Sequence, residues 1–210
     1  MTRFDEIYQS QENYYPRPTK ALSAYVLVRG LVGKHGADLG AGNGRNALML
    51  ASLGARVDAY DESSVAMNEL TATAGRHAMQ VNCRVKDVRQ VAYDPASLDF
   101  VVASTILDHL PSSDSILVLH RMWRWIRISG WLYVSTFTTE DPSASPGTAT
   151  AAASETADHI VNHFEPQQLL HSMQELGGIV RYYSESVETD TSHGTPHKHG
   201  IARAVVERWS

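Results

Sequence analysis

Short apolar runs alternate with segments whose apolar residues recur at helical spacing along most of this 210-residue chain. The apolar runs predict strands at 36–39, 55–60, 81–87, 98–105 and 131–137. The helical spacing predicts helices at 18–31, 45–53, 63–77 and 112–126. This alternation is typical of an α/β fold, in which crossover helices cover a largely parallel sheet.

Local signals set the ends of these predicted helices. Ser63 or Ser64 is expected to cap the start of the helix at 63–77, because a serine hydroxyl can accept a free amide there. Gly54 is expected to close the helix at 45–53. In the helix at 112–126, four apolar residues are predicted to share one stripe, namely Ile116, Leu119, Trp123 and Ile126.

The alternation breaks after residue 137. Residues 138–157 are rich in Ser, Thr, Ala and Pro without apolar periodicity, which predicts a long mobile loop that acts as a lid. A helix is expected at 165–178, with Pro166 in its first turn and Gly177 or Gly178 at its end. Two last strands, 179–187 and 201–209, are predicted to be joined by a His-rich turn at 192–200.

Composition narrows the class of protein. A hydrophobic fraction of 43% and a charged fraction of 20% are those of an ordinary globular protein. The net charge of −5 argues against nucleic acid as a partner. The single Cys83 excludes an internal disulfide and suits a reducing compartment. The polar start of the chain has no signal-peptide core, and no apolar run approaches the ~20 residues of a membrane span. We therefore expect a cytoplasmic protein without a membrane partner.

The most constrained stretch is ADLGAGNGRNALMLASLGARVDAYD, residues 37–61. It places Gly40, Gly42 and Gly44 between a predicted strand and a predicted helix. Such a turn exposes backbone N–H groups to a ligand, and glycine lets the ligand approach the backbone closely. Dinucleotide enzymes and S-adenosylmethionine (SAM) methyltransferases share this geometry, and a purely structural turn is a third interpretation.

Two details favour SAM over a dinucleotide. The third glycine of a dinucleotide fingerprint would fall at Arg45, whereas Gly44 comes one position early. Asp38 ends the first strand, and a carboxylate there suits the cationic ammonium and sulfonium groups of SAM better than a pyrophosphate.

Two further acids follow the next strands. Asp61 is placed to accept both ribose hydroxyls. Asp87 is placed to accept the adenine amino group, with the amide of Val88 near a ring nitrogen. Each acid alone is also an ordinary turn residue, but ligand crevices of open α/β sheets lie at these carboxyl ends of strands.

At this point the sequence resembles class I SAM-dependent methyltransferases, and in DLGAGNGRN, CRVKDV and DFVVASTILDHL it resembles the tellurite-resistance (TehB-like) family. The resemblance implies a Rossmann-like, seven-stranded, mostly parallel sheet with one antiparallel strand and helices on both faces. It implies SAM as cofactor. The expected cofactor-binding residues are Asp38, Gly40, Ala41, Gly42, Asn43, Gly44, Arg45, Asn46, Asp61, Glu62, Asp87, Val88, Ser104 and Thr105.

The expected organisation is one methyltransferase domain over 1–210. It comprises an N-terminal arm and helix (1–35), a cofactor-binding core (36–137), the loop (138–157), and a C-terminal helix and hairpin (158–210). The expected activity is methyl transfer to a small molecule, either a chalcogen oxyanion or thiol, or else an O or N atom of an organic metabolite. A non-catalytic SAM-binding module is the less favoured alternative. We expect a monomer or homodimer.

Three histidines are the candidate catalytic residues. His197 and His199 are two apart, so they point to one face of a strand. With Lys198 and His193 they are placed to bind an anion, supply a base or ligate a metal, or they form an exposed polar hairpin. No metal is predicted, because no carboxylate or Cys accompanies them at ligand spacing in the sequence. His109 follows the fourth strand, where it contacts the acceptor or caps a helix.

Two other groups have alternative interpretations. Tyr14, Tyr15 and Arg17 either close over the cofactor as an arm or pack the N-terminus. The arginines at 121, 124 and 127, interleaved with two tryptophans, are expected to form a solvated helix face rather than an RNA-binding surface.

Overall fold

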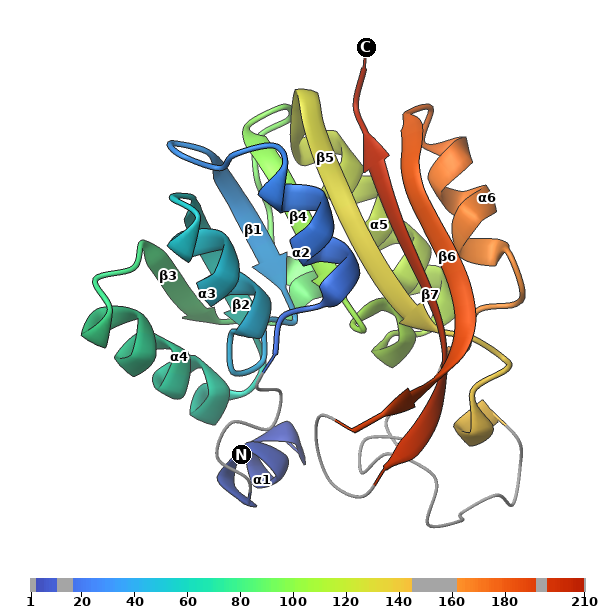
Figure 1. Ribbon diagram of the computed structural model, residues 1–210, viewed down its shortest axis with the longest axis horizontal. Helices are drawn as coiled ribbons and strands as arrows, with labels where there is room; N and C mark the ends of the chain where they lie inside the picture. The colour runs from blue at the N-terminus through green and yellow to red at the C-terminus, as the bar shows by residue number, and fades with distance from the viewer. Residues whose placement is uncertain (1–2, 11–16, 145–161, 192–195, 210) are drawn as a thin grey trace.

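A computed structural model describes residues 3–10, 17–144, 162–191 and 196–209, and it contains a seven-stranded sheet with the order β3-β2-β1-β4-β5-β7-β6 (Figure 1). The strands are β1 (His35–Leu39), β2 (Arg56–Asp61), β3 (Val81–Val85), β4 (Leu98–Ser104), β5 (Ile126–Phe137), β6 (Ile179–Asp190) and β7 (His197–Glu207). Strands β1 to β5 pair in parallel, whereas β7 is antiparallel to both β5 and β6. The predicted sheet with one antiparallel strand is confirmed.

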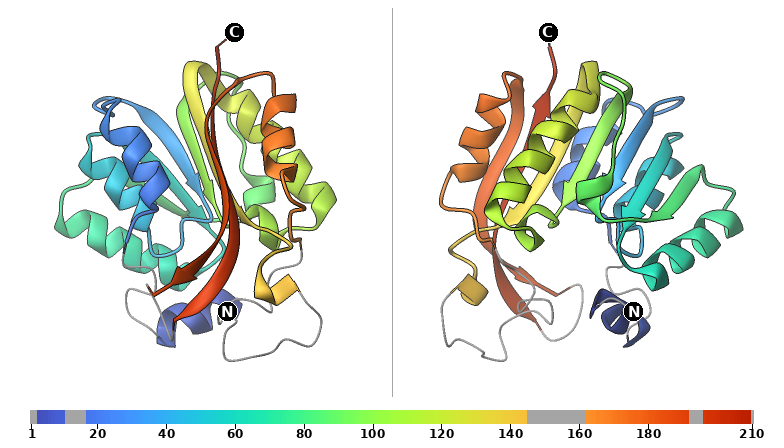
Figure 2. Two further views of the ribbon diagram at one scale, coloured as in Figure 1. Left: turned by 45° about the vertical axis from the view of Figure 1, so that its right-hand side comes forward. Right: turned by 180° about the vertical axis from the view of Figure 1, so that it is seen from behind.

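Helices cover both faces of this sheet (Figure 2). The α-helices are α1 (Arg3–Ser10), α2 (Lys20–Leu27), α3 (Arg45–Ser52), α4 (Ser64–Arg76), α5 (Ser112–Trp125) and α6 (Gln168–Glu175). Short 3-10 turns are η1 (Val88–Gln90), η2 (Leu107–His109) and η3 (Pro142–Ala144). The predicted caps are also found, since the Ser63 hydroxyl accepts from the Ala66 amide and Gly54 follows α3 with φ +91°.

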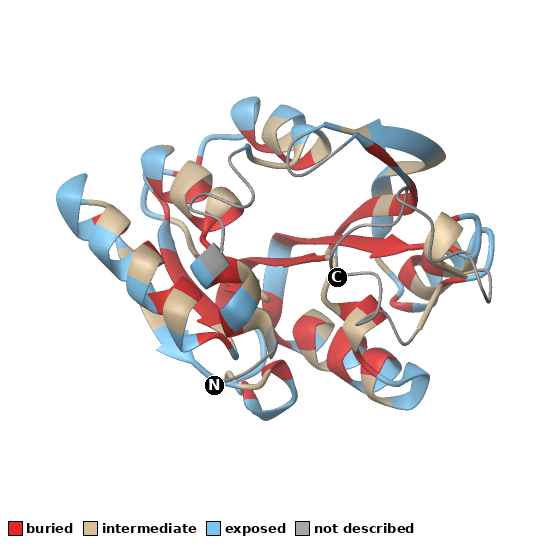
Figure 3. Cartoon of the chain, turned by 90° about the horizontal axis from the view of Figure 1, so that it is seen from below, coloured by how far each residue is buried: buried red, intermediate tan, exposed pale blue. Residues whose placement is uncertain are grey.

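Two apolar cores hold the layers together, one on each face of the sheet. Buried residues of α2, α3 and α4 pack on one face, and those of α5 and α6 pack on the other. Figure 3 shows the buried residues along the strands and the inner sides of the helices, with exposed residues outside. Because β1 and β4 are buried on both faces, they read in the sequence as continuous apolar runs rather than as alternating patterns.

The buried stripe of α5 differs from the prediction. Ile116 is 48% exposed, and the buried residues of the helix are Ser115, Val118, Leu119, Met122 and Trp125. The prediction counted the buried face of the helix from the apolar Ile116. The buried face in fact starts one residue earlier, at the small polar Ser115, so the predicted face was rotated around the helix axis. Ile126 is buried, but it is the first residue of β5 rather than part of the helix.

The C-terminal elements also begin at other residues than predicted. Helix α6 starts at Gln168, after Gln167 in a left-handed conformation (φ +63°), so Pro166 precedes the helix. Strand β7 starts at His197, so His197 and His199 are strand residues rather than turn residues. The prediction placed the start of the strand too late because residues 197–199 are all polar and do not form an apolar run. Both histidines are buried, which excludes the exposed polar hairpin.

Part of the predicted loop and arm lies outside the described residues. Thr138 forms an isolated bridge with Phe164, and η3 follows at 142–144. The rest of the predicted lid, Tyr14, Tyr15 and His193 are not described. Within the described part of the chain, no helix is both long and apolar enough to cross a membrane.

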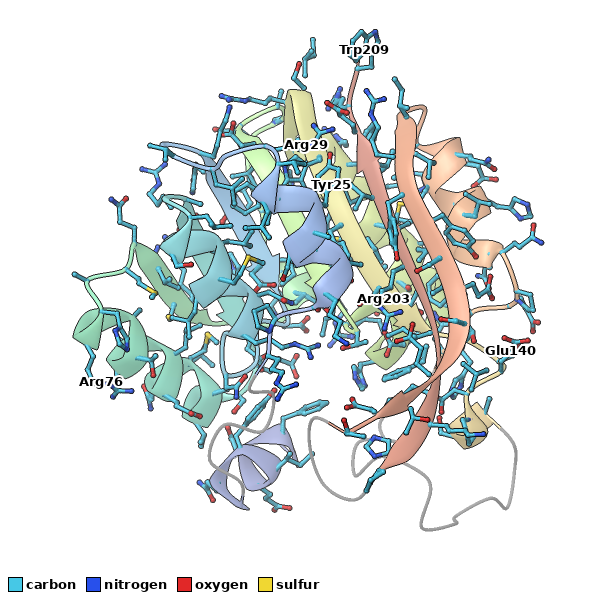
Figure 4. All side chains as sticks on the ribbon, viewed as in Figure 1. Tyr25, Arg29, Arg76, Glu140, Arg203 and Trp209 are labelled. Carbon is cyan, nitrogen blue, oxygen red and sulfur yellow. The ribbon has the colours of Figure 1, made fainter. Side chains whose placement is uncertain are left out.

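Contacts at both ends of α2 hold it in place, one from Arg29 just after the helix and one from Thr19 just before it. The Arg29 guanidinium lies 4.4 Å from the centre of the Tyr25 ring and pairs with Glu207 of β7 at 3.2 Å (Figure 4). At the other end, the Thr19 amide donates to Asn46 at 3.1 Å. Because Asn46 stands in the first turn of α3, this bond connects α2 to the glycine turn.

One edge of the sheet collects the residues expected to be functional. Strands β1, β2, β4 and β5 end there, and β7 begins there because it runs the opposite way. Figure 1 shows α1 beside the same edge. The sheet topology thus brings together the strand-end acids, the glycine turn and the histidine pair.

Candidate cofactor and acceptor site

A cavity of about 180 Å³ opens at this edge, at the carboxyl ends of β1, β2 and β4. This is where ligands bind in open α/β sheets. Eleven of the predicted cofactor residues line it, namely Gly40, Ala41, Gly42, Arg45, Asn46, Asp61, Glu62, Asp87, Val88, Ser104 and Thr105. His109 lines it as well, together with residues that were not predicted, namely Phe4, Ile7, Tyr8, Arg89, Ile106, Leu110 and Pro111.

The glycine turn requires glycine at two positions on the cavity wall. Gly40 and Gly42 have φ values of +67° and +54°, a conformation that costs other residues energy. A Cβ on Gly40 would lie 2.8 Å from the Ile106 side chain, and one on Gly42 would overlap the Tyr8 hydroxyl. The bare backbone therefore leaves room both for α1 and for a ligand.

Asp61 ends β2 and stands at the centre of the cavity wall. Its carboxylate accepts the amide of Gly42 at 2.8 Å and the amide of Ser63 at 2.9 Å. Burial raises the pKa of Asp61, although these amides oppose the effect. A carboxylate has about four lone-pair positions, and the two amides take two of them. The remaining positions suit the two vicinal hydroxyls of a ribose.

Asp87 follows β3 and is held by Arg89, which the sequence did not single out. The Arg89 Nε lies 2.9 and 3.0 Å from the two carboxylate oxygens of Asp87, and its guanidinium also pairs with Asp114 at 3.3 Å. The hydrogen bonds from Arg89 lower the pKa of Asp87, so the group is an anion near neutral pH. Arg89 thus holds Asp87 as an anion, Val88 is buried beside it, and the expected contact between Asp87 and an adenine amino group stays a prediction.

Three predicted residues, Asp38, Asn43 and Gly44, are absent from the cavity lining. Asp38 is only 1% exposed, and burial raises its pKa to about 7 against the opposing charge of Arg45. Gly44 is the residue that caps the start of α3, and it faces Leu70. The structure thus places them behind the wall, and the expected contact between Asp38 and a cationic group stays a prediction.

The end of β4 forms the next part of the wall. The Ser104 hydroxyl is hydrogen bonded to that of Ser135 at 3.0 Å. Thr105 has φ +50°, a strained conformation for a β-branched residue that is found mostly at functional sites. His109 packs edge-on against Phe4 of α1, with ring centres 5.4 Å apart.

A row of three hydrogen-bonded side chains lies at the start of β7. His199 Nδ1 is 2.9 Å from Asp141 Oδ2, and His199 Nε2 is 3.0 Å from His197 Nε2. Both histidines are less than 9% exposed, and the His199 ring packs on Phe137. Although burial alone would raise the pKa of Asp141, hydrogen bonds from His199 and Ser143 lower it. Asp141 is therefore an anion that fixes the orientation of His199.

Asp108 is a further carboxyl group close to this row. It is fully buried, and neither of its side-chain oxygens has a hydrogen-bond partner among the described residues. Burial raises its pKa to about 8, and the charge of Asp141 adds to the effect. It stands next to His109, so η2 connects the cavity wall with the histidine pair. Asp108 and Asp141 were missed because they come four residues after the ends of β4 and β5, further from their strands than Asp61 and Asp87.

Comparisons with known proteins agree with this geometry. Residues 37–130 match the family described as "Methyltransferase domain". A ubiquinone biosynthesis O-methyltransferase of Xanthomonas campestris pv. campestris (strain B100) is 32% identical over 118 residues, which make up 53% of this chain and 47% of the relative. The chain thus spans about half the length of the curated relatives that it matches.

Solved structures show the same fold at low identity. TehB from Haemophilus influenzae superposes with a TM-score of 0.74 at 16% identity, over 98% of this chain and 67% of that one. Magnesium protoporphyrin IX methyltransferase from Synechocystis PCC 6803, solved with bound SAH, gives 0.67 at 16% identity over 90% and 80%. The [4+2]-cyclase SpnF also gives 0.67 at 16% identity over 90% and 80%.

The domain match over residues 37–130, the sheet order and the position of the cavity all resemble those of class I SAM-dependent methyltransferases. The fold resembles that of TehB, as the sequence predicted.

Proposed function

We propose that this chain transfers the methyl group of SAM to a hydroxyl oxygen of a small organic molecule. The observation that carries the proposal is the hydrogen-bonded row Asp141–His199–His197 at the sheet edge that also holds the cofactor cavity. The fold alone does not decide the reaction, since a [4+2]-cyclase shares it.

The cavity residues fit SAM as cofactor. Asp61 keeps lone pairs for two hydroxyls, Asp87 is an acceptor for an amino group, and the glycine turn offers bare backbone. Bound SAM supplies the methyl group on its sulfonium. The residues of this chain hold the cofactor by its nucleoside and leave the transfer to take place between the cavity and the start of β7.

The acceptor's chemistry is argued from the charges near the histidines. A hydroxyl must lose its proton as it takes the methyl group, so it needs a nearby base. Asp141 accepts from His199 Nδ1 at 2.9 Å and so orients this imidazole, as the aspartate of a catalytic triad orients its histidine. A thiolate or an oxyanion has no such proton to lose, so neither needs this arrangement.

An anionic acceptor is disfavoured for a second reason. The Asp141 carboxylate lies 2.9 Å from His199 and would repel an anion there. Arg203, further along the same face of β7, already forms two hydrogen bonds with Glu188, at 2.7 and 2.8 Å. The printed name of the curated relative, an O-methyltransferase, points the same way. The likeness to TehB keeps a chalcogen oxyanion or thiol as the second candidate.

The test is an acceptor screen with radiolabelled SAM. Phenols, catechols and aliphatic alcohols are compared with amines, thiols, selenite and tellurite. We expect label transfer to a hydroxylated compound. For that compound, the double variant His197→Ala/His199→Ala should lower kcat/KM at least about 100-fold, as the loss of a general base does, with little change in SAM affinity. The matched control is His171→Ala, because His171 is exposed on α6.

The pH dependence of kcat/KM provides a second test. If neutral imidazoles take the proton, kcat/KM should rise with pH across the range in which histidines deprotonate. Turnover of tellurite or a thiol above every hydroxylated compound, unaffected by the double variant, would contradict the proposal.

A further inference from the structure

Besides Asp141 and Asp108, a third acid, Asp190, lies near the histidine pair, and sequence spacing did not predict this. In the β6–β7 hairpin, Asp190 lies opposite His197 in register, although seven residues separate the two in the chain. One carboxylate oxygen of Asp190 and one ring nitrogen from each of His197 and His199 all lie within 4.8 Å of one another. Two imidazoles and a carboxylate at this spacing are a common set of metal ligands.

The orientation of His199 is that of a metal ligand. Its Nδ1 lies 2.9 Å from Asp141 Oδ2, so Nδ1 carries the proton and the lone pair stands on Nε2. Asp141 is itself held by the amides of Ser143 and Gly200, at 2.9 and 3.1 Å. A carboxylate that receives the second N–H of an imidazole is the usual outer partner of a metal-bound histidine.

The distance between the two imidazoles fits a shared ion. Two nitrogens on one tetrahedral Zn²⁺, with bonds of ~2.0–2.1 Å, lie roughly 3.3 Å apart. The Nε2 atoms of His197 and His199 are 3.0 Å apart, so a small outward shift is enough. Without an ion, two lone pairs cannot face each other at this distance, and one proton must stand between them.

The local charge also favours a cation. The Asp141 carboxylate lies 2.9 Å from His199, and a carboxylate oxygen of Asp190 lies within 4.8 Å of a ring nitrogen of each histidine. A divalent ion bound among these groups would be attracted by both carboxylates.

We propose that Asp190, His197 and His199 bind one divalent transition-metal ion of the Zn²⁺ type, with Asp141 orienting His199. Imidazole ligands suit Zn²⁺, Co²⁺ and Ni²⁺, whereas Mg²⁺ and Ca²⁺ prefer all-oxygen sites. Three protein ligands leave a fourth position for an acceptor oxygen, and because the imidazole lone pairs would then be on the ion, the ion rather than a histidine would make the acceptor's proton easier to remove. That last role rests on the proposed function, but the metal binding does not.

The test uses the full chain after treatment with a chelator and dialysis. Co²⁺ is titrated first, because tetrahedral Co²⁺ absorbs visible light, and Zn²⁺ affinity is then measured by competition. We expect one ion per chain at micromolar Zn²⁺ or below. His197→Ala and His199→Ala should each weaken binding at least 100-fold, and Asp190→Asn should also weaken it. Asp141→Asn should weaken binding about 10–100-fold, the usual effect of losing an outer partner.

Two matched controls should leave metal binding unchanged. His171→Ala removes an exposed histidine of α6, and Glu188→Gln removes a carboxylate opposite His199 that is engaged by Arg203. Retained binding of S-adenosylhomocysteine shows that each variant is folded.

Wild-type protein that binds the cofactor product but takes up neither ion below millimolar concentrations would overturn the metal site. Binding that survives in both histidine variants would overturn it equally. Failure of the proposed O-methylation is a separate result, since metal binding is measured without any acceptor.

Discussion

Asp61→Ala should weaken SAM binding strongly, because this carboxylate is placed to accept both ribose hydroxyls. Each hydrogen bond to a charged group contributes about 1.5–3 kcal/mol. Because water partly replaces the lost partner in the variant, we expect a loss of about 2–4 kcal/mol, which is roughly 30- to 900-fold in Kd. The matched control is Asp94→Ala, which removes an exposed acid from a loop.

The structure also shows a second way in which this variant acts. Asp61 accepts the amides of Gly42 and Ser63, so its loss loosens the glycine turn as well. A double-mutant cycle separates the two effects. An S-adenosylhomocysteine analogue lacking both ribose hydroxyls should bind wild type and Asp61→Ala with nearly equal affinity if the hydroxyls carry the effect.

Isothermal titration calorimetry with SAM, its demethylated product, NAD and the analogue gives all the affinities. We expect wild type to bind SAM and its product in the micromolar range or tighter, and NAD poorly. The reasoning is refuted if Asp61→Ala is folded and binds SAM with wild-type affinity. It is refuted for the ribose contact alone if the analogue loses as much affinity on mutation as SAM does.

Two further predictions concern the cavity wall and the buried acid behind it. Gly42→Ala should lower both the melting temperature and SAM affinity, because Gly42 has φ +54° and a Cβ there meets the Tyr8 hydroxyl. The control is Gly75→Ala, where the added Cβ meets no other atom. Equal melting temperatures and SAM affinities of the two variants would argue against the close approach of α1. Asp108 has its pKa raised to about 8 in the folded chain, so stability should fall as pH rises from about 4 to 8, and Asp108→Asn should flatten this fall. Urea unfolding at pH 5, 7 and 9 with chelator present checks this, and parallel curves for the two proteins would contradict it.

Most of the fold was predictable from the sequence because local patterns specify it. The apolar runs at β1 and β4 reflect burial of both faces of these strands, and Ser63 and Gly54 mark helix ends through their own chemistry. The wall of the cavity was predictable for a related reason. Its glycines and acids follow one another at successive strand ends, and a parallel sheet brings all such ends to one edge.

The partners of those residues were decided only by the tertiary structure. Asp114 of α5 pairs with Arg89 beside Asp87, and α1 brings Tyr8 to Gly42 across a long stretch of sequence. The histidine site shows the limit most clearly. Asp141 and Asp190 lie 58 and 9 residues from His199, and only the antiparallel pairing of β7 with β5 and β6 brings them to it. Sequence spacing shows which residues share a face of one strand, but register between strands decides which side chains meet.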